Sequence, residues 1–219
     1  KGIESLLSQA GVARVQGTAR FVDAYAVEVG GQRLSARNIL VATGSVPSRI
    51  PGFEGERVWT SDELLEAKAC PAALTILGGG VIGVEFASVF AAFGVKVTIV
   101  EMMPHILPAM EADLAKLLSE SLHKRGVTIY AGAKALSMTP ETLDIETEGV
   151  RKTLPLDTLL VAVGRRPAVE GLNLEAAGLA ADRRGLAVGP AMQTQVPHIY
   201  AVGDVTGAST LAHAASSQA

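Results

Sequence analysis

The chain has 219 residues, enough for one large domain or two small ones. Hydrophobic residues make up 48% of it and charged residues 19%, a balance that excludes an intrinsically disordered chain. Lys+Arg 19 against Asp+Glu 22 gives a net charge of −3, so the chain is no polycation and we expect no nucleic-acid partner.

Membrane and secretory signals are missing from the sequence pattern. The longest apolar runs, such as residues 159–163, are far shorter than the roughly 20 residues of a membrane helix. The single cysteine, Cys70, cannot pair within the chain and supplies too few thiolates for a zinc or iron-sulfur site. No basic and apolar leader precedes the first folded pattern. We therefore expect a cytoplasmic protein without a membrane partner.

The first part of the chain predicts a helix and a small antiparallel sheet. Residues 3–10 have a helical pattern that Gly11 ends. Short alternating runs follow at residues 12–15, 20–22 and 26–29, with a Gly30-Gly31 turn typical of a hairpin. The apolar run from Asn38 predicts a strand that is buried on both faces and opens into Thr43-Gly44-Ser45.

A break at Pro47, Pro51 and Gly52 marks a candidate domain boundary. After it, Thr60 and Glu63 form a capping box for a short helix. Strands and helices then alternate, and the expected elements are strand 74–77, helix 81–93, strand 95–100, helix 111–125 and strand 127–130. This order predicts an α/β fold: a Rossmann-like, doubly wound domain with a parallel sheet and right-handed crossovers.

The later elements complete that prediction. In helix 111–125 four leucines are expected on one face, namely Leu114, Leu117, Leu118 and Leu122. Further expected features are an antiparallel meander at 135–148, a buried strand at 158–163, a break at 165–167, a short helix near Leu174, a turn at 182–185, a strand at 198–202 and a helix starting near Ser209.

A glycine-rich loop is the strongest chemical signal. Residues 78–83 match G-x-G-x-x-G, and the match follows an apolar strand and opens a helix. In this context Gly78 allows the tight turn, Gly80 lets the backbone approach a pyrophosphate and Gly83 lets helix and strand pack closely. The free amides at the helix start then face the phosphates. The loop predicts a dinucleotide site.

Glu101 ends the next strand, eighteen residues after Gly83, near the spacing at which an acidic side chain accepts hydrogen bonds from the adenosine ribose. A 2′-phosphate would place a dianion beside this carboxylate. Met102, Met103 and Pro104 offer no positive charge to offset it, and His105 is the only cation candidate nearby. The pattern therefore favours NAD(H).

Other polar residues allow either a structural or a ligand-binding interpretation. Glu85 either stabilises the start of its helix or faces the nicotinamide riboside, and spacing does not decide between them. Asp204 and the Thr43-Gly44-Ser45 segment either shape turns or bind a ligand at a sheet edge. The four histidines lack a partner that would argue for a triad or a metal site, so we predict no catalytic residue and no metal.

Six segments together resemble the family of FAD-dependent pyridine nucleotide-disulfide oxidoreductases, and within it the dihydrolipoamide dehydrogenase branch. The segments are 38–45, 78–86, 97–101, 161–167, 199–204 and 210–213. The resemblance implies a partial FAD-domain segment at 1–45, an NAD-binding domain at 46–165 and a second partial FAD-domain segment at 166–219. It also implies hydride transfer between NAD(H) and FAD, coupled through a cysteine pair to a dithiol such as lipoamide.

The resemblance assigns individual contacts. It implies NAD contacts for Gly78, Gly79, Gly80, Val81, Ile82, Gly83, Val84, Glu85, Glu101, Ala135 and Gly164. It implies FAD contacts for Thr43, Gly44, Ser45, Asp204, Thr210, Leu211, Ala212 and His213. The implied partners are small-molecule cofactors, a second subunit in a homodimeric parent and a 2-oxo acid dehydrogenase complex.

Three family features are absent from this sequence: the first glycine-rich loop for FAD, the redox cysteine pair and the C-terminal domain with its catalytic His-Glu pair. We therefore expect an internal fragment that is catalytically incomplete and retains little FAD. Two alternatives stay open. One is a flavoenzyme without a redox disulfide, such as an NADH oxidase or a ferredoxin or nitrite reductase partner. The other is a non-catalytic NAD-binding module.

Overall fold

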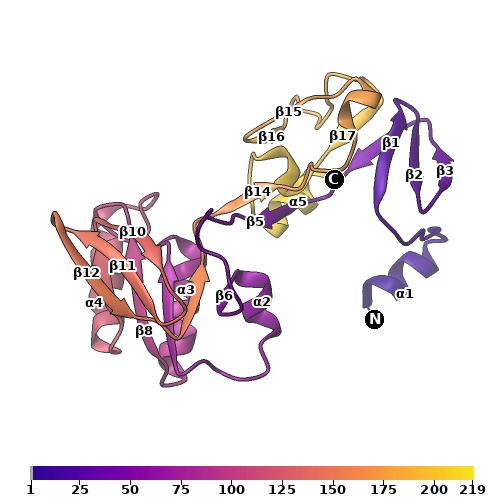
Figure 1. Ribbon diagram of the computed structural model, residues 1–219. Helices are drawn as coiled ribbons and strands as arrows, with labels where there is room; N and C mark the ends of the chain where they lie inside the picture. The colour runs from indigo at the N-terminus through magenta and orange to yellow at the C-terminus, as the bar shows by residue number, and fades with distance from the viewer. Residues whose placement is uncertain (1) are drawn as a thin grey trace. The chain divides into compact units, whose positions relative to one another are not determined.

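The computed structural model describes residues 2–219, which fall into two compact units (Figure 1). The central unit consists of residues 47–165. The second unit combines the two flanking parts of the chain, up to residue 46 and from 166 to 219. Segments far apart in the sequence therefore build one unit, whereas the central unit is continuous.

The central unit is built on a five-stranded parallel sheet in the order β6-β13-β7-β8-β9. Its strands are β6 (Val58–Trp59), β7 (Ala73–Leu77), β8 (Lys96–Glu101), β9 (Thr128–Ala131) and β13 (Thr158–Val161). The expected strand and helix alternation is confirmed, and the fold is the predicted Rossmann-like α/β fold. The position of β13 between β6 and β7 is not visible in the local sequence, because only long-range pairing decides it.

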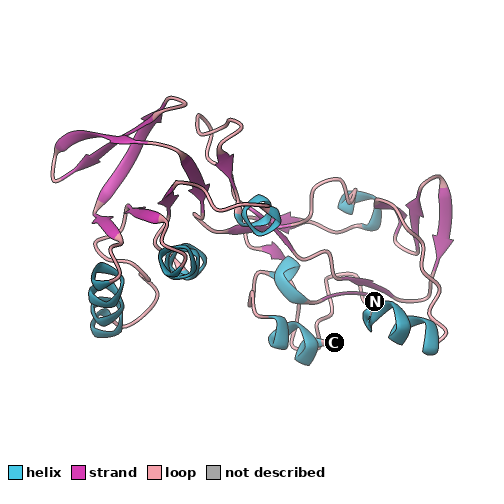
Figure 2. Cartoon of the chain, turned by 90° about the horizontal axis from the view of Figure 1, so that it is seen from below, coloured by secondary structure: helices cyan, strands magenta, loops and turns pink. Residues whose placement is uncertain are grey.

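Both faces of this sheet are covered, so its strands are apolar almost throughout. Leu74, Ile76 and Leu160 belong to a core with the helices, whereas Leu77 and Leu159 belong to a core with an antiparallel sheet. Successive side chains of a strand point to opposite faces, which explains the division. The antiparallel sheet contains β10 (Ala133–Met138), β11 (Thr142–Thr147) and β12 (Val150–Pro155). Figure 2 shows the helices and the antiparallel sheet on opposite sides of the parallel strands.

Three helices accompany the parallel sheet: α2 (Ser61–Glu66), α3 (Val81–Ala92) and α4 (Ala112–Lys124). The capping box at the start of α2 is confirmed. The predicted apolar face of α4 is partly wrong. Leu122 is buried and Leu118 packs against the core, but Leu114 and Leu117 are exposed. Ala115 is buried instead, because positions 115, 118 and 122 are spaced three and four residues apart and therefore share the contact face.

The second unit contains short elements around a smaller core. Its elements are α1 (Gly2–Gln9), β1 (Ala19–Asp23), β2 (Ala26–Val29), β3 (Gln32–Ser35), β4 (Ile39–Val41), η1 (Leu174–Ala177), β15 (Ala181–Asp182), β16 (Gly185–Leu186), β17 (Ile199–Ala201), η2 (Gly203–Thr206) and α5 (Ala212–Gln218). β1, β2 and β3 form the predicted antiparallel meander, and β4 pairs in parallel with β17. β5 (Ser45–Pro47) pairs with β14 (Arg165–Pro167) where the chain passes between the units.

Three expectations for this unit are wrong. Residues 12–15 form no strand, since they have no neighbour to pair with. The strand from Ile39 is not buried on both faces, because β4 pairs only with β17 and leaves Leu40 exposed. The last helix begins at Ala212 rather than near Ser209, after Leu211 in extended conformation.

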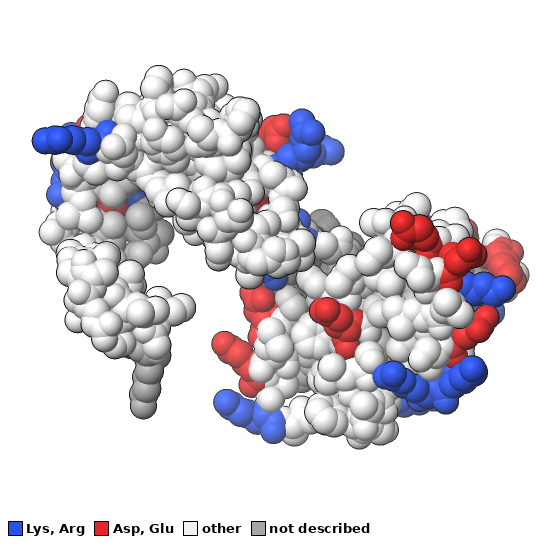
Figure 3. Space-filling view, turned by 180° about the vertical axis from the view of Figure 1, so that it is seen from behind, with Lys and Arg blue, Asp and Glu red and all other residues white. Residues whose placement is uncertain are grey.

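No helix within residues 2–219 combines the length and the apolar character needed to cross a membrane. On the face drawn in Figure 3, acidic and basic side chains are interspersed and no continuous basic surface is formed. This distribution agrees with the small net charge of the sequence.

Candidate functional site

The glycine-rich loop lies at the carboxyl edge of the parallel sheet, between β7 and α3. Gly78 has φ +105°, and a Cβ there would approach the Ala162 carbonyl oxygen to 2.5 Å. Its amide donates to the Val100 carbonyl oxygen at 2.9 Å, so the loop is tied to β8. Both conformation and space therefore require glycine at this position.

Gly80 and Gly83 differ in the space around them: Gly83 is closely packed, whereas Gly80 is open. A Cβ on Gly83 would lie 2.0 Å from the Gly78 carbonyl oxygen, so this glycine makes the close approach of helix and loop possible. A Cβ on Gly80 would find no heavy atom within 4 Å. Gly80 is the N-cap of α3 and provides no side-chain cap for the first-turn amides. The loop is packed from behind and open at the helix start, as an anion site at a helix N-terminus requires.

Glu101 is the acidic group of this edge. Its side chain is 8% exposed and reaches the loop: Oε2 accepts from the Gly79 amide at 2.5 Å. Oε1 accepts from the Met103 amide at 2.7 Å. The carboxylate is thus held in place by two main-chain donors directly beside the glycine loop.

The segment after β8 also holds the loop, and the sequence pattern did not reveal it. Ile106 is fully buried, and its Cγ2 would lie 2.8 Å from a Cβ on Gly79. The Leu107 amide donates to the Gly79 carbonyl oxygen at 2.7 Å. Gly79 therefore has its own steric and hydrogen-bonding role. An irregular segment has no periodicity, and the only available signal was its place directly after the acidic strand end.

The remaining residues predicted for NAD do not all lie at this edge. Val81 and Glu85 are exposed on α3, Ile82 is half-buried and Val84 is buried in the helix-side core. Among residues 2–219, the Glu85 side chain forms no hydrogen bond or ion pair. Gly164 follows β13 at the carboxyl edge with φ +119°. Ala135 lies in β10 and packs against the core on the other face of the sheet.

A second group of predicted residues meets at the carboxyl ends of β4 and β17. Because these strands are parallel, Ser45 after one and Asp204 after the other are brought together across 159 positions of sequence. The Ser45 hydroxyl donates to Asp204 Oδ2 at 2.6 Å. Thr43 Oγ1 donates to the Ala168 carbonyl oxygen at 2.8 Å, and the Gly44 carbonyl accepts from the Ala168 amide at 2.9 Å.

The segment 210–213 adjoins this group through α5. Thr210, Leu211, Ala212 and His213 are exposed at the start of the helix. The helix packs against the turn that carries Asp204, since the Gly203 amide donates to Gln218 Oε1 at 2.7 Å. The C-terminal end of α5 therefore lies near the predicted ligand-binding turn, and its N-terminal end, with residues 210–213, lies at the surface.

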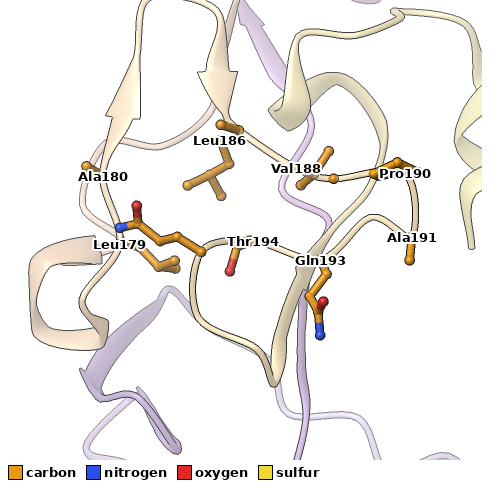
Figure 4. A pocket seen from close by; sticks show the side chains of 11 residues that line it. Leu179, Ala180, Leu186, Val188, Pro190, Ala191, Gln193 and Thr194 are labelled. Carbon is orange, nitrogen blue, oxygen red and sulfur yellow. The ribbon is translucent and has the colours of Figure 1, made fainter.

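A cavity of about 430 Å³ lies elsewhere in the second unit (Figure 4). None of the residues predicted for a cofactor lines it, and none of its lining side chains carries a charge. The Thr194 hydroxyl points to main-chain carbonyls of Val196 and Ile199. We assign no chemistry to this cavity.

The described histidines and the cysteine form no reactive cluster. His105, His123 and His198 each have a ring nitrogen within hydrogen-bond distance of a main-chain carbonyl oxygen. Cys70 is an exposed loop thiol. Among residues 2–219 no group of three or more His, Cys, Asp or Glu side chains is arranged to hold a metal ion.

Comparisons with known proteins agree with this arrangement. The model of the pyridine nucleotide-disulphide oxidoreductase family matches residues 1–219. A dihydrolipoyl dehydrogenase from Chlorobaculum tepidum is 42% identical and is matched by 100% of this chain over 49% of its own length. One from Bacillus subtilis is 38% identical over 98% of this chain and 49% of its own length. The chain spans about half the length of these relatives.

Solved structures agree as well. The HOCl-induced flavoprotein disulfide reductase RclA from Escherichia coli superposes with a TM-score of 0.88 at 33% identity, over 99% of this chain and 52% of that one. LpdA from Mycobacterium tuberculosis gives a TM-score of 0.88 at 31% identity, over 99% and 50%. The glycine loop, the acidic strand end and these matches over the full length together assign the chain to the pyridine nucleotide-disulphide oxidoreductase family.

Proposed function

We propose that the central unit binds NAD(H), with the diphosphate on the first-turn amides of α3, beside the glycine loop, and the adenosine ribose on Glu101. The observation that carries this proposal is the 2.5 Å hydrogen bond from the Gly79 amide to Glu101 Oε2, which joins the two parts of the site. The open space at Gly80 supports it, since a diphosphate needs room at the helix start. Glu85, exposed and unpaired on α3, is the candidate contact to the nicotinamide riboside.

We further propose that the Ser45-Asp204 pair and the segment 210–213 contact FAD. Asp204 is half-buried and its Oδ2 is bonded to Ser45, which leaves Oδ1 available to a ligand hydroxyl. NAD(H) and FAD, if bound by these residues, would supply the hydride-transfer chemistry. The role of this chain is to bind and orient them, because its one cysteine is an exposed loop residue and supplies no redox pair.

We also propose that the chain is part of a longer enzyme, a flavin-dependent disulfide oxidoreductase of the dihydrolipoamide dehydrogenase kind. The names of the relatives support this choice of substrate class. Cytoplasmic location, a homodimeric parent and a 2-oxo acid dehydrogenase complex belong to the same proposal. The 219-residue chain by itself is expected to retain little FAD and to reduce no lipoamide. Stoichiometric flavin absorbance in the purified chain would contradict the first expectation.

Titration with NADH and NADPH tests the dinucleotide site. We expect the wild type to prefer NADH, and Glu101→Ala to lose roughly tenfold to hundredfold in NADH affinity, since a hydrogen bond to a charged group contributes about 1.5–3 kcal/mol. Glu101→Gln keeps the size of the side chain and is the matched control for charge. Wild-type preference for NADPH would refute the role of Glu101.

A further inference from the structure

Two consecutive methionines lie at the edge of the proposed dinucleotide site. Met102 is 67% exposed and Met103 44% exposed, directly after Glu101. Exposed thioethers react with peroxides, whereas buried ones are protected. The chain contains five methionines, and Met110 is comparably exposed at 49%. The pair differs from Met110 in following Glu101 directly and in the bond of the Met103 amide to that carboxylate.

The backbone of this pair is attached to the site itself. The Met103 amide donates to Glu101 Oε1 at 2.7 Å, and the other oxygen of that carboxylate holds the Gly79 amide. The Met103 carbonyl oxygen accepts from the Gly132 amide at 2.8 Å. Met103 is therefore connected through its own amide to the carboxylate that is proposed to bind the ribose.

Resting on the proposed NAD(H) site, we propose that Met102 and Met103 form a methionine oxidation site that lowers dinucleotide affinity. The adenine of a dinucleotide whose ribose lay on Glu101 would extend past the end of β8, where Met102 and Met103 follow in the chain. Thioethers make favourable contacts with aromatic rings, each about 0.3–1.5 kcal/mol in other proteins. A sulfoxide is polar and loses that contact.

The oxidation is a two-electron oxygen transfer from a peroxide. The sulfur attacks one peroxide oxygen, the S–O bond forms and the O–O bond breaks. Hydrogen peroxide is reduced to water, and the thioether is oxidised to the sulfoxide. Methionine sulfoxide reductases reverse the modification. The site is thus a reversible, redox-dependent control of dinucleotide binding.

The test measures NADH dissociation constants before and after treatment with hydrogen peroxide, with oxidation of each methionine followed by mass spectrometry. The protein carries Cys70→Ala, because the exposed thiol also reacts with peroxide. We expect the dissociation constant to rise roughly fivefold on oxidation and to return after treatment with a methionine sulfoxide reductase.

Two variants locate the effect. In Met102→Leu/Met103→Leu, the ratio of dissociation constants after and before peroxide should fall to about one. In Met110→Leu, the matched control, the ratio should stay at the value of the parent protein. Met102→Gln/Met103→Gln, which places polar amides at these positions, should weaken NADH binding without peroxide.

The outcomes separate the two proposals. An unchanged dissociation constant in protein with both sulfoxides overturns the oxidation site while leaving NADH binding intact. Loss of the peroxide response in Met110→Leu also overturns it. If the untreated protein binds no NADH, the proposed function itself fails and the oxidation site fails with it.

Discussion

The carboxyl edges of the two parallel sheets in this chain collect polar groups in the same way but hold them differently. In the central unit, five strands are covered on both faces, and the Glu101 carboxylate is buried and bonded by two main-chain amides. In the second unit, β4 and β17 form a two-stranded sheet, and the Asp204 carboxylate accepts a hydrogen bond from the Ser45 hydroxyl. The carboxylate at the edge of the five-stranded sheet is held by main-chain donors, whereas the carboxylate at the edge of the two-stranded pair is held by a side chain.

The largest loss of stability in the central unit is expected for Gly83→Ala. The added methyl group would lie 2.0 Å from the Gly78 carbonyl oxygen, and neither backbone segment can move freely. We expect the free energy of unfolding of this unit to fall by about 3 kcal/mol. Trp59, the only tryptophan of the chain, lies in β6 and reports the unfolding by its fluorescence. An unchanged urea midpoint would show that the loop is not packed against α3.

Gly80→Ala is the matched control in stability and a test of binding in its own right. Its methyl group meets no heavy atom within 4 Å and its φ is −73°, so the free energy of unfolding should change by less than about 1 kcal/mol. NADH affinity should fall roughly tenfold, because the methyl group occupies the space proposed for the diphosphate. Equal NADH dissociation constants for variant and wild type would contradict the proposed position of the diphosphate at Gly80.

Ser45→Ala tests how much the hydrogen bond between Ser45 and Asp204 stabilises the second unit. The substitution removes the 2.6 Å hydrogen bond to Asp204, which should destabilise the β4-β17 pair by about 1 kcal/mol. Amide hydrogen exchange of Val202, whose amide bonds the Val41 carbonyl oxygen, should quicken, while exchange in β7 stays unchanged. Uniform acceleration in both units would contradict the independence of the two edges.

The smallest expected effect is a pH dependence at α2. The hydrogen bond from the Thr60 hydroxyl is the largest cause that lowers the pKa of Glu63 from 4.5 to about 2. A lowered carboxyl pKa stabilises the fold above about pH 4.5, and this contribution is lost as the pH falls toward 2. Glu63→Gln should lower the free energy of unfolding by less than about 1 kcal/mol at pH 6 and by nearly nothing near pH 2. Urea unfolding at both pH values measures this, and a constant difference would refute it.

Local patterns were sufficient for much of this fold. The strand and helix alternation of residues 73–131, the capping box of Thr60 and Glu63 and the close approach at Gly83 were predictable, because each depends on periodicity or on neighbours a few residues away. The exposed Leu117 and the missing strand at residues 12–15 were mispredicted. Pattern and propensity do not tell which apolar residue finds a partner.

The sequence by itself determined the residue types at the glycine loop, the acid at the end of β8 and the order of strands and helices along the chain. Only the tertiary structure decided that Glu101 bonds the Gly79 amide, that Ile106 packs behind the loop and that Ser45 meets Asp204. The physical reason is the range of the interactions. Helix caps and alternation act between neighbours in sequence, whereas strand pairing joins distant segments and thereby sets which side chains share an edge.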